Sequence, residues 1–92
     1  MAYLTARFEV PDYDTFKERW DSDPVGRQQA AAIGHRICRG VENPNEVIVQ
    51  VEFPSAADAK SFRERLKDSG TTDNLKLSGP PVVVEEEETV AY

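Results

Sequence analysis

Apolar and polar residues alternate along three stretches of this chain, and each alternation predicts a half-buried β-strand. Every second residue of Tyr3–Val10 is apolar, and Pro11 ends that strand. The segment Ile33–Phe53 contains two further strands around the turn-forming residues Glu42–Asn45, which predicts a hairpin. A last strand is expected from Val82 to about Val90.

The spacing of apolar residues changes to three and four between the first strand and the hairpin, which predicts an amphipathic helix. Tyr13, Phe16 and Trp20 form its apolar stripe, and Asp12 or Asp14 is the expected N-cap. A second helix start follows at Asp23-Pro24, with a short helical run through Gln28 to Ala32 that Gly34 ends.

A second amphipathic helix follows the hairpin. Ser55 and Asp58 form a capping box at its start, and Gly70 is placed to end it. The stretch Thr71–Pro81 is then expected to be a loop with a possible helical turn near Asn74–Leu77. The residues of the helix that face the sheet are expected to be Ala59, Phe62 and Leu66.

These elements give the order β-α-β-β-α-β, which predicts an α+β, ferredoxin-like fold with a four-stranded antiparallel sheet. Residues 1–92 are read as one domain. Right-handed crossovers place both helices on one face of the sheet. That face is predicted to hold the apolar residues of the first and third strands, joined from the second strand by Ile37 and Val41; a β-bulge near Gly34 or Gly40 would change this assignment.

The opposite face of the sheet is expected to be mixed in character. It carries too much apolar area for an ordinary wetted surface and too many polar groups for a sealed core, so pairing of two copies through this face is expected. The predicted residues of this face are Tyr3, Thr5, Arg7, Glu9, Arg36, Cys38, Ile48, Gln50 and Glu52.

Composition and charge narrow the possible partners. The formal net charge is −6 and the pI is about 4.7, which argues against nucleic acid and anionic membranes. Four of the seventeen acidic residues are Glu85–Glu88, and the other thirteen nearly balance eleven basic ones. Only 39% of the 92 residues are hydrophobic, which predicts a small hydrophobic core. Small domains commonly gain stability by oligomerisation.

The single cysteine, Cys38, excludes an internal disulfide and a multi-cysteine metal cluster. The chain has no apolar run long enough to span a membrane, and its start lacks the apolar region of a signal peptide. A cytoplasmic location is therefore expected.

Four segments resemble the dimeric α+β barrel superfamily, in particular its antibiotic-biosynthesis-monooxygenase-like (ABM-like) domains. They are Val10–Phe16, Gly34–Arg39, Asn43–Phe53 and Gly79–Pro81. The resemblance implies a homodimer with a ligand cleft between sheet and helices in each subunit. It also implies cofactor-free oxygenation of aromatic polyketides, polyketide cyclisation or haem degradation, and a fold that hosts several reactions does not choose among them.

Haem degradation is rejected because the second helix has no histidine to bind iron and the only tryptophan, Trp20, is on the first helix. His35-Arg36 loosely fits the histidine and basic residue that cyclase-type members place near the second strand. The resemblance implies a protein without a cofactor. No metal is expected either, because one histidine without a nearby ligand cluster cannot make a metal site.

His35, Arg36 and Arg7 are the candidate catalytic residues. His35 has a reference pKa near neutrality and is the candidate proton shuttle, and the two arginines are candidate stabilisers of an anion. Simpler interpretations are favoured for each. His35 would be a solvent-exposed residue at a strand end, and the arginines would pair with Glu9, Glu52 or Glu85–Glu88.

Trp20, Tyr3 and Gln50 are the candidate substrate-binding residues, although three aromatic residues at helical spacing more often form core. Cys38 is interpreted as a small packing residue, and Glu85–Glu88 as charges that guard a sheet edge. Two functions stay open: a cofactor-free homodimer that binds or transforms a small hydrophobic or aromatic, polyketide-like metabolite by monooxygenase- or cyclase-type chemistry, and a non-catalytic dimeric binding module.

Overall fold

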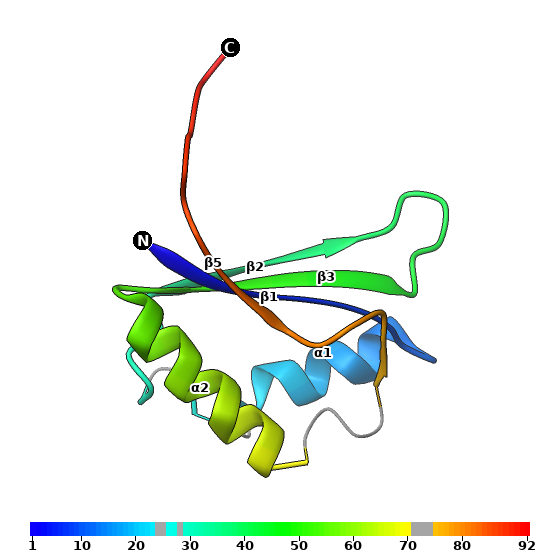
Figure 1. Cartoon of the computed structure of the whole chain (residues 1–92). Coiled ribbons are helices and arrows are strands. Elements are labelled where there is room, and N and C mark those ends of the chain that lie inside the picture. Colours follow the sequence, from blue (N-terminus) through cyan, green and yellow to red (C-terminus); the bar gives the residue numbers. More distant parts are fainter. Residues whose placement is uncertain (24–25, 28, 71–74) are drawn as a thin grey trace.

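The computed structural model of this chain describes residues 1–23, 26–27, 29–70 and 75–92. Two helices, α1 (Tyr13–Asp21) and α2 (Ala56–Asp68), lie on one face of an antiparallel sheet, as Figure 1 shows. The strands are β1 (Ala2–Glu9), β2 (Gly34–Arg39), β3 (Glu46–Phe53), β4 (Lys76–Leu77) and β5 (Val82–Glu85). The predicted α+β fold is confirmed.

The sheet differs from the prediction in its number of strands. Its order is β2-β3-β1, and both β4 and β5 pair with the free edge of β1, so the described chain has five strands and not four. The short strand β4 replaces the helical turn expected near Asn74–Leu77, of which residue 74 lies outside the described residues.

The last strand is also shorter than predicted, because it ends at Glu85 and not near Val90. Beyond it the chain leaves the sheet on the face opposite the helices (Figure 1). The edge-guarding interpretation of Glu85–Glu88 therefore applies to Glu85 alone, and the next three glutamates belong to the C-terminal tail.

The predicted helix ends agree closely with the structure. The Asp12 side chain accepts a hydrogen bond from the Thr15 backbone N–H (3.2 Å), and Ser55 does the same for Asp58 (3.2 Å). Gly70 follows α2 in the left-handed region (φ 68°), as expected of a residue that ends a helix.

The helical run expected from Gln28 to Ala32 is not a helix in its described part, which forms hydrogen-bonded turns. Pro24 and Gln28 lie outside the described residues.

The residues that face the helices are those that the alternation predicts. In the β1–β3 ladder Leu4 lies opposite Val51 and Phe8 opposite Val47, and all four are buried. Side chains from α2 complete this core, because bulky β-branched and aromatic residues pack well between a sheet and a helix. The buried residues are Ala2, Leu4, Phe8, Val10, Val47, Val49, Val51, Phe53, Ala59 and Phe62.

One core prediction is wrong. Ile37 packs against the core as expected, but Val41 is fully exposed because β2 ends at Arg39. Gly40 begins the turn between β2 and β3, where its N–H donates to the Glu46 carbonyl (2.8 Å). A Cβ atom on Gly40 would stand 2.4 Å from the Asn43 carbonyl oxygen, so this close approach requires glycine.

Candidate ligand-binding site

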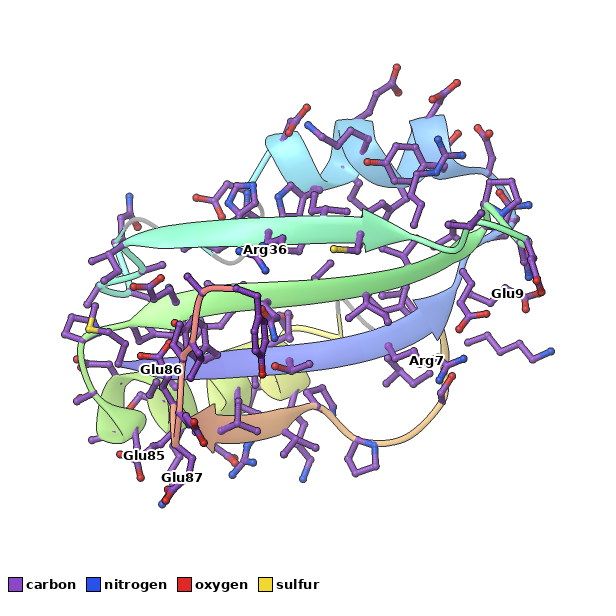
Figure 2. All side chains as sticks on the ribbon, turned by 90° about the horizontal axis from the view of Figure 1, so that it is seen from above. Arg7, Glu9, Arg36, Glu85, Glu86 and Glu87 are labelled. Atoms are coloured by element: carbon purple, nitrogen blue, oxygen red, sulfur yellow. The ribbon has the colours of Figure 1, made fainter. Side chains whose placement is uncertain are left out.

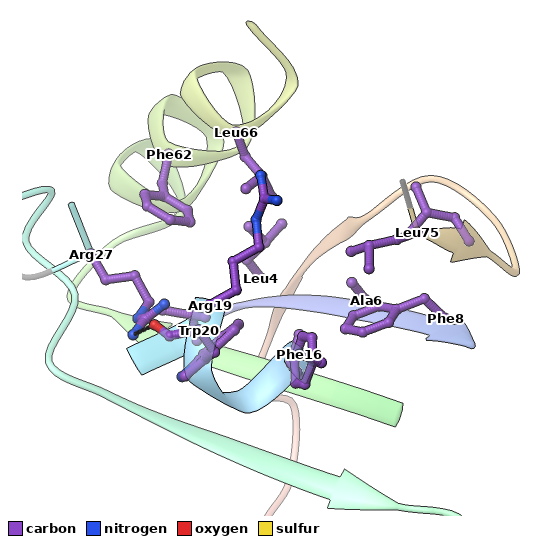
Figure 3. Close-up of a pocket in the computed structure, with 13 residues that line it drawn as sticks. Leu4, Ala6, Phe8, Phe16, Arg19, Trp20, Arg27, Phe62, Leu66 and Leu75 are labelled. Carbon is purple, nitrogen blue, oxygen red and sulfur yellow. Dashed lines mark hydrogen bonds between the residues drawn. The ribbon is translucent and has the colours of Figure 1, made fainter. Parts of the chain in front are cut away.

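A cavity of about 90 Å³ lies between the sheet and the two helices. Figure 3 shows side chains of α1, α2 and β1 around it. Eleven of its thirteen lining residues are apolar and the other two are arginines. The lining residues are Leu4, Ala6, Phe8, Phe16, Arg19, Trp20, Arg27, Val49, Val51, Phe62, Leu66, Leu75 and Leu77.

The cavity exists because α1 covers its part of the sheet incompletely. None of the residues of α1 is fully buried, so Phe16 and Trp20 pack on the sheet while still leaving space beside them. An apolar cavity of this kind stays dry and is available to an apolar guest. Ala6 contributes to the space because it is the smallest side chain on the helix-facing side of β1 at that point.

Arg27 closes one side of the cavity and is held by several partners. Its guanidinium donates to the Trp20 carbonyl (2.8 Å), lies 4.0 Å from the centre of the Trp20 ring and pairs with Asp23 (3.6 Å). Desolvation lowers the pKa of Arg27, and the carboxylates of Asp23 and Asp21 oppose that shift. Arg27 thus brings a fixed positive charge to the apolar wall.

Trp20 lines the cavity with its ring and points its indole N–H outward to His35. The indole nitrogen donates to Nε2 of His35 (3.3 Å), and the two rings meet edge to face at 5.2 Å. Because an indole N–H only donates, Nε2 must accept and the neutral imidazole carries its proton on Nδ1. His35 therefore positions Trp20 in this structure and presents no free acceptor to the cavity.

The environment of His35 favours the neutral form that this hydrogen bond requires. Desolvation lowers the pKa of His35, and the positive charges of Arg27 and Lys17 lower it further. Protonation would place a donor opposite the indole N–H and add a positive charge near Arg27. The Trp20–His35 contact is therefore a property of the neutral protein and weakens in acid.

The other candidate catalytic residues lie on the opposite face of the sheet. Register places Arg36 opposite Gln50 and Arg7 opposite Ile48, whereas His35 lies opposite the helix-facing Val51. Figure 2, seen onto this open face, shows Arg36 and Arg7 far apart along it. The structure therefore does not gather the six in one site, but Tyr3, His35, Arg36 and Gln50 together border a hollow on the open face, from which Trp20 and Arg7 are absent.

Arg7 is already neutralised, but by a partner different from those expected. It forms an ion pair with Glu46, and not with Glu9, Glu52 or Glu85–Glu88. Cys38 is exposed on the same face, so its interpretation as a packing residue is wrong within one subunit.

The C-terminal tail and the open face enclose a second, wider hollow of about 500 Å³. Tyr3 donates to Glu86 here (3.3 Å), and desolvation, Glu86 and Glu52 raise the pKa of its phenol. Most residues that line this hollow are polar, and four of them are glutamates against one arginine. Such a surface offers little apolar contact and repels anions, so the helix-side cavity is the candidate ligand site. The lining residues are Tyr3, Gly34, His35, Arg36, Gln50, Glu52, Glu86, Glu87, Glu88 and Thr89.

Sequence patterns singled out Trp20, which lines the cavity, but missed the two arginines of the cavity. Arg19 looked like part of the polar side of the first helix, although it stands directly between Phe16 and Trp20 at the border of the apolar stripe. Arg27 is seven residues after Trp20, which gives two turns of separation only if the intervening chain is helical. The helix α1 ends at Asp21, so helical spacing offered no signal for Arg27.

The described residues contain no helix long and apolar enough to cross a membrane. In the same part of the chain, no three histidine, cysteine, aspartate or glutamate side chains gather as a metal site would require.

Comparison with known proteins finds the same fold in several solved structures. A provisionally assigned antibiotic biosynthesis monooxygenase from Bordetella bronchiseptica superposes with a TM-score of 0.66 at 16% identity, over 97% of each chain. One from Deinococcus radiodurans, also provisionally assigned, gives 0.63 at 10% identity, over 100% of this chain and 98% of that one. A third antibiotic biosynthesis monooxygenase superposes with a TM-score of 0.62 at 16% identity, over 98% of this chain and 100% of that one.

No family model matches the sequence, and no curated protein matches it either. The chain therefore has the ABM-like α+β fold, as the four sequence segments predicted, and at these identities the likeness concerns the fold.

Proposed function

We propose that this protein binds a small hydrophobic, aromatic, polyketide-like metabolite in the helix-side cavity and transforms it by monooxygenase- or cyclase-type chemistry, without a bound cofactor. The observation that carries the proposal is the cavity itself, with eleven apolar residues and two guanidinium groups in its wall. Apolar pockets with a few directed polar groups are the usual sites of small-molecule binding. The names of the solved neighbours support the monooxygenase class.

Both reaction types begin when an activated carbon loses a proton to a solvent base and becomes an enolate. Arg27 holds its positive charge beside the Trp20 ring, where it would stabilise that enolate in a low-dielectric wall. In the oxygenation, a methylene carbon then loses its two C–H bonds and gains one C=O bond. The carbon gives up four electrons to dioxygen, whose second oxygen atom leaves as water with both hydrogens.

We further propose that two copies pair through the open face. Apolar side chains remain exposed on it in one subunit: Ile48, Val82 and Val84 are 38%, 51% and 37% exposed. Register places all three beside the polar residues of that face, with Val82 opposite Thr5 and Val84 opposite Tyr3. A second copy would cover this mixed surface and add to a core that is small for a monomer.

The oxygenation is tested with 1-phenylpropan-2-one, which has a single ring and an activated methylene group between that ring and a carbonyl. We expect the protein to accelerate oxygen uptake, measured with an oxygen electrode, and the variant Ala6→Leu to abolish the acceleration because three added carbon atoms occupy the cavity. Uptake equal to that in protein-free buffer would contradict monooxygenase activity.

A second function, binding without catalysis, is favoured by one observation. Among the cavity-lining residues that the structure describes, none has a side chain that titrates near neutrality, and the Nε2 atom of His35 is occupied by Trp20. Quenching of Trp20 fluorescence by 1-phenylpropan-2-one, lost in Ala6→Leu but unaccompanied by oxygen uptake, would establish this function in place of the first. Trp20 is the only tryptophan, so the signal reports on the cavity directly.

A further inference from the structure

Arg19 lies at the rim of the cavity, and its guanidinium pairs with no other described residue. It extends from α1 across the cavity toward Leu66 on α2, as Figure 3 shows. Its backbone carbonyl accepts from Ser22 (2.6 Å), but its side chain has no hydrogen bond or ion pair with the residues that the structure describes. Asp23, four residues on and beyond the end of α1, binds Arg27 and not Arg19.

The two arginines of the cavity thus differ in the charge that they can offer. Arg27 is satisfied by a carboxylate, a carbonyl and an aromatic ring. Arg19 has none of these, and no acidic residue lines the cavity. One uncompensated positive charge therefore stands at the mouth of an apolar space, in a protein whose formal net charge is −6.

We propose that Arg19 selects a ligand that carries one planar anionic group, a carboxylate, next to an apolar ring. This inference rests on the proposed function of the cavity and names the chemical class of its ligand. The ring enters the cavity, and the carboxylate accepts two parallel N–H bonds from the Arg19 guanidinium at the rim. A guanidinium matches a carboxylate in this two-point geometry, and Arg19 is exposed, so its guanidinium is accessible to such a ligand.

The size of the cavity limits the apolar part of the ligand. A volume of about 90 Å³ is smaller than the cavities of roughly 150 Å³ that accept benzene in other proteins, so a single ring that also uses the open rim is the largest guest expected without rearrangement.

The test compares trans-cinnamate with trans-cinnamamide, which have the same shape and differ in charge. Binding is followed through the indole N–H cross-peak of ¹⁵N-labelled protein, which belongs to Trp20 alone. We expect cinnamate to bind about tenfold more tightly than the amide, the difference that one charge-assisted hydrogen-bonded pair supplies. In Arg19→Gln the two ligands should bind equally, with the affinity for the amide unchanged.

Lys17→Gln is the matched control, because it removes one positive charge from the same helix outside the cavity lining. It should keep the preference for cinnamate, and Arg19→Lys should keep only part of it. Equal binding of the acid and the amide by the wild-type protein, or a preference that survives Arg19→Gln, would overturn the role of Arg19 while leaving the apolar site in place. Failure of both ligands to move the Trp20 cross-peak would overturn the binding function as well.

Discussion

The two faces of the sheet are built from the same strands but have opposite properties. On the helix side, alternate residues such as Val47 and Phe53 are fully buried and leave one apolar cavity. On the open side, the residues between them are polar or only half covered, and Arg7 and Tyr3 bind carboxylates there. Since successive strand residues point to opposite faces, one sequence alternation encodes both surfaces. In the proposed function the ligand binds on the helix side and a second copy covers the open side.

The largest expected effect is the loss of a core ring on the helix side. Phe53→Ala removes a fully buried side chain that stacks on Phe62 (ring centres 5.5 Å apart). We expect the free energy of unfolding to fall by about 3–5 kcal/mol, measured by urea denaturation. The comparison variant Ile48→Ala on the open face should change it by less than about 1 kcal/mol in the dissociated protein. Equal losses would show that the two faces do not differ in this way.

The next effect concerns pairing through the open face. Ile48→Asp places a charge at the centre of the proposed interface and should weaken self-association by about 2 kcal/mol or more, roughly 30-fold, by sedimentation velocity. Lys60→Asp, on the exposed side of α2, is the control and should leave association unchanged. A wild-type protein that stays monomeric at micromolar concentration would contradict the pairing of these faces.

A smaller effect is expected on the pH dependence of the free energy of unfolding, to which His35 contributes. The pKa of His35 is lowered in the folded protein, so the unfolded chain binds the proton more readily as pH falls. The contribution of His35 to stability is therefore complete above its unfolded pKa of about 6.5 and is lost below it. Wild type should lose more unfolding free energy than His35→Gln between neutral and mildly acidic pH. Parallel pH profiles of the two proteins would argue against the Trp20–His35 contact.

The smallest effect is expected for the ion pair on the open face. Arg7 and Glu46 are both partly exposed, so a double-mutant cycle with Arg7→Gln and Glu46→Gln should give a coupling below about 1 kcal/mol that declines with salt. A coupling of several kcal/mol would mean that this pair is desolvated, as it would be if the partner subunit covered it.

The fold was readable from the sequence because its signals are local. Alternation in β1 and β3, the caps at Asp12 and Ser55, and the glycine after α2 each depend on residues close together in the chain. Errors arose where pairing across the sheet decides the outcome. Lys76 and Leu77 form a strand because they pair with Phe8 and Glu9. Two residues are too few to show an alternation, so the sequence did not predict this strand.

The site was harder to predict because it depends on which face each residue occupies and on what already binds it. His35 and Arg36 are adjacent in sequence, so they looked like one catalytic pair, but their side chains leave opposite faces of β2. Arg7 was a candidate until Glu46 proved to be its partner. Arg19 and Arg27 escaped notice because their value lies in the cavity, which only tertiary packing creates.

The division of roles between the two faces is tested most directly by a crystal structure of the protein grown with trans-cinnamate. We expect the ring between Trp20, Phe62 and Leu66, its carboxylate against Arg19, and a second copy over Ile48 and Val84 on the open face. A ligand bound against Arg36 and Tyr3 beneath the C-terminal tail, with the helix-side cavity empty, would contradict this assignment.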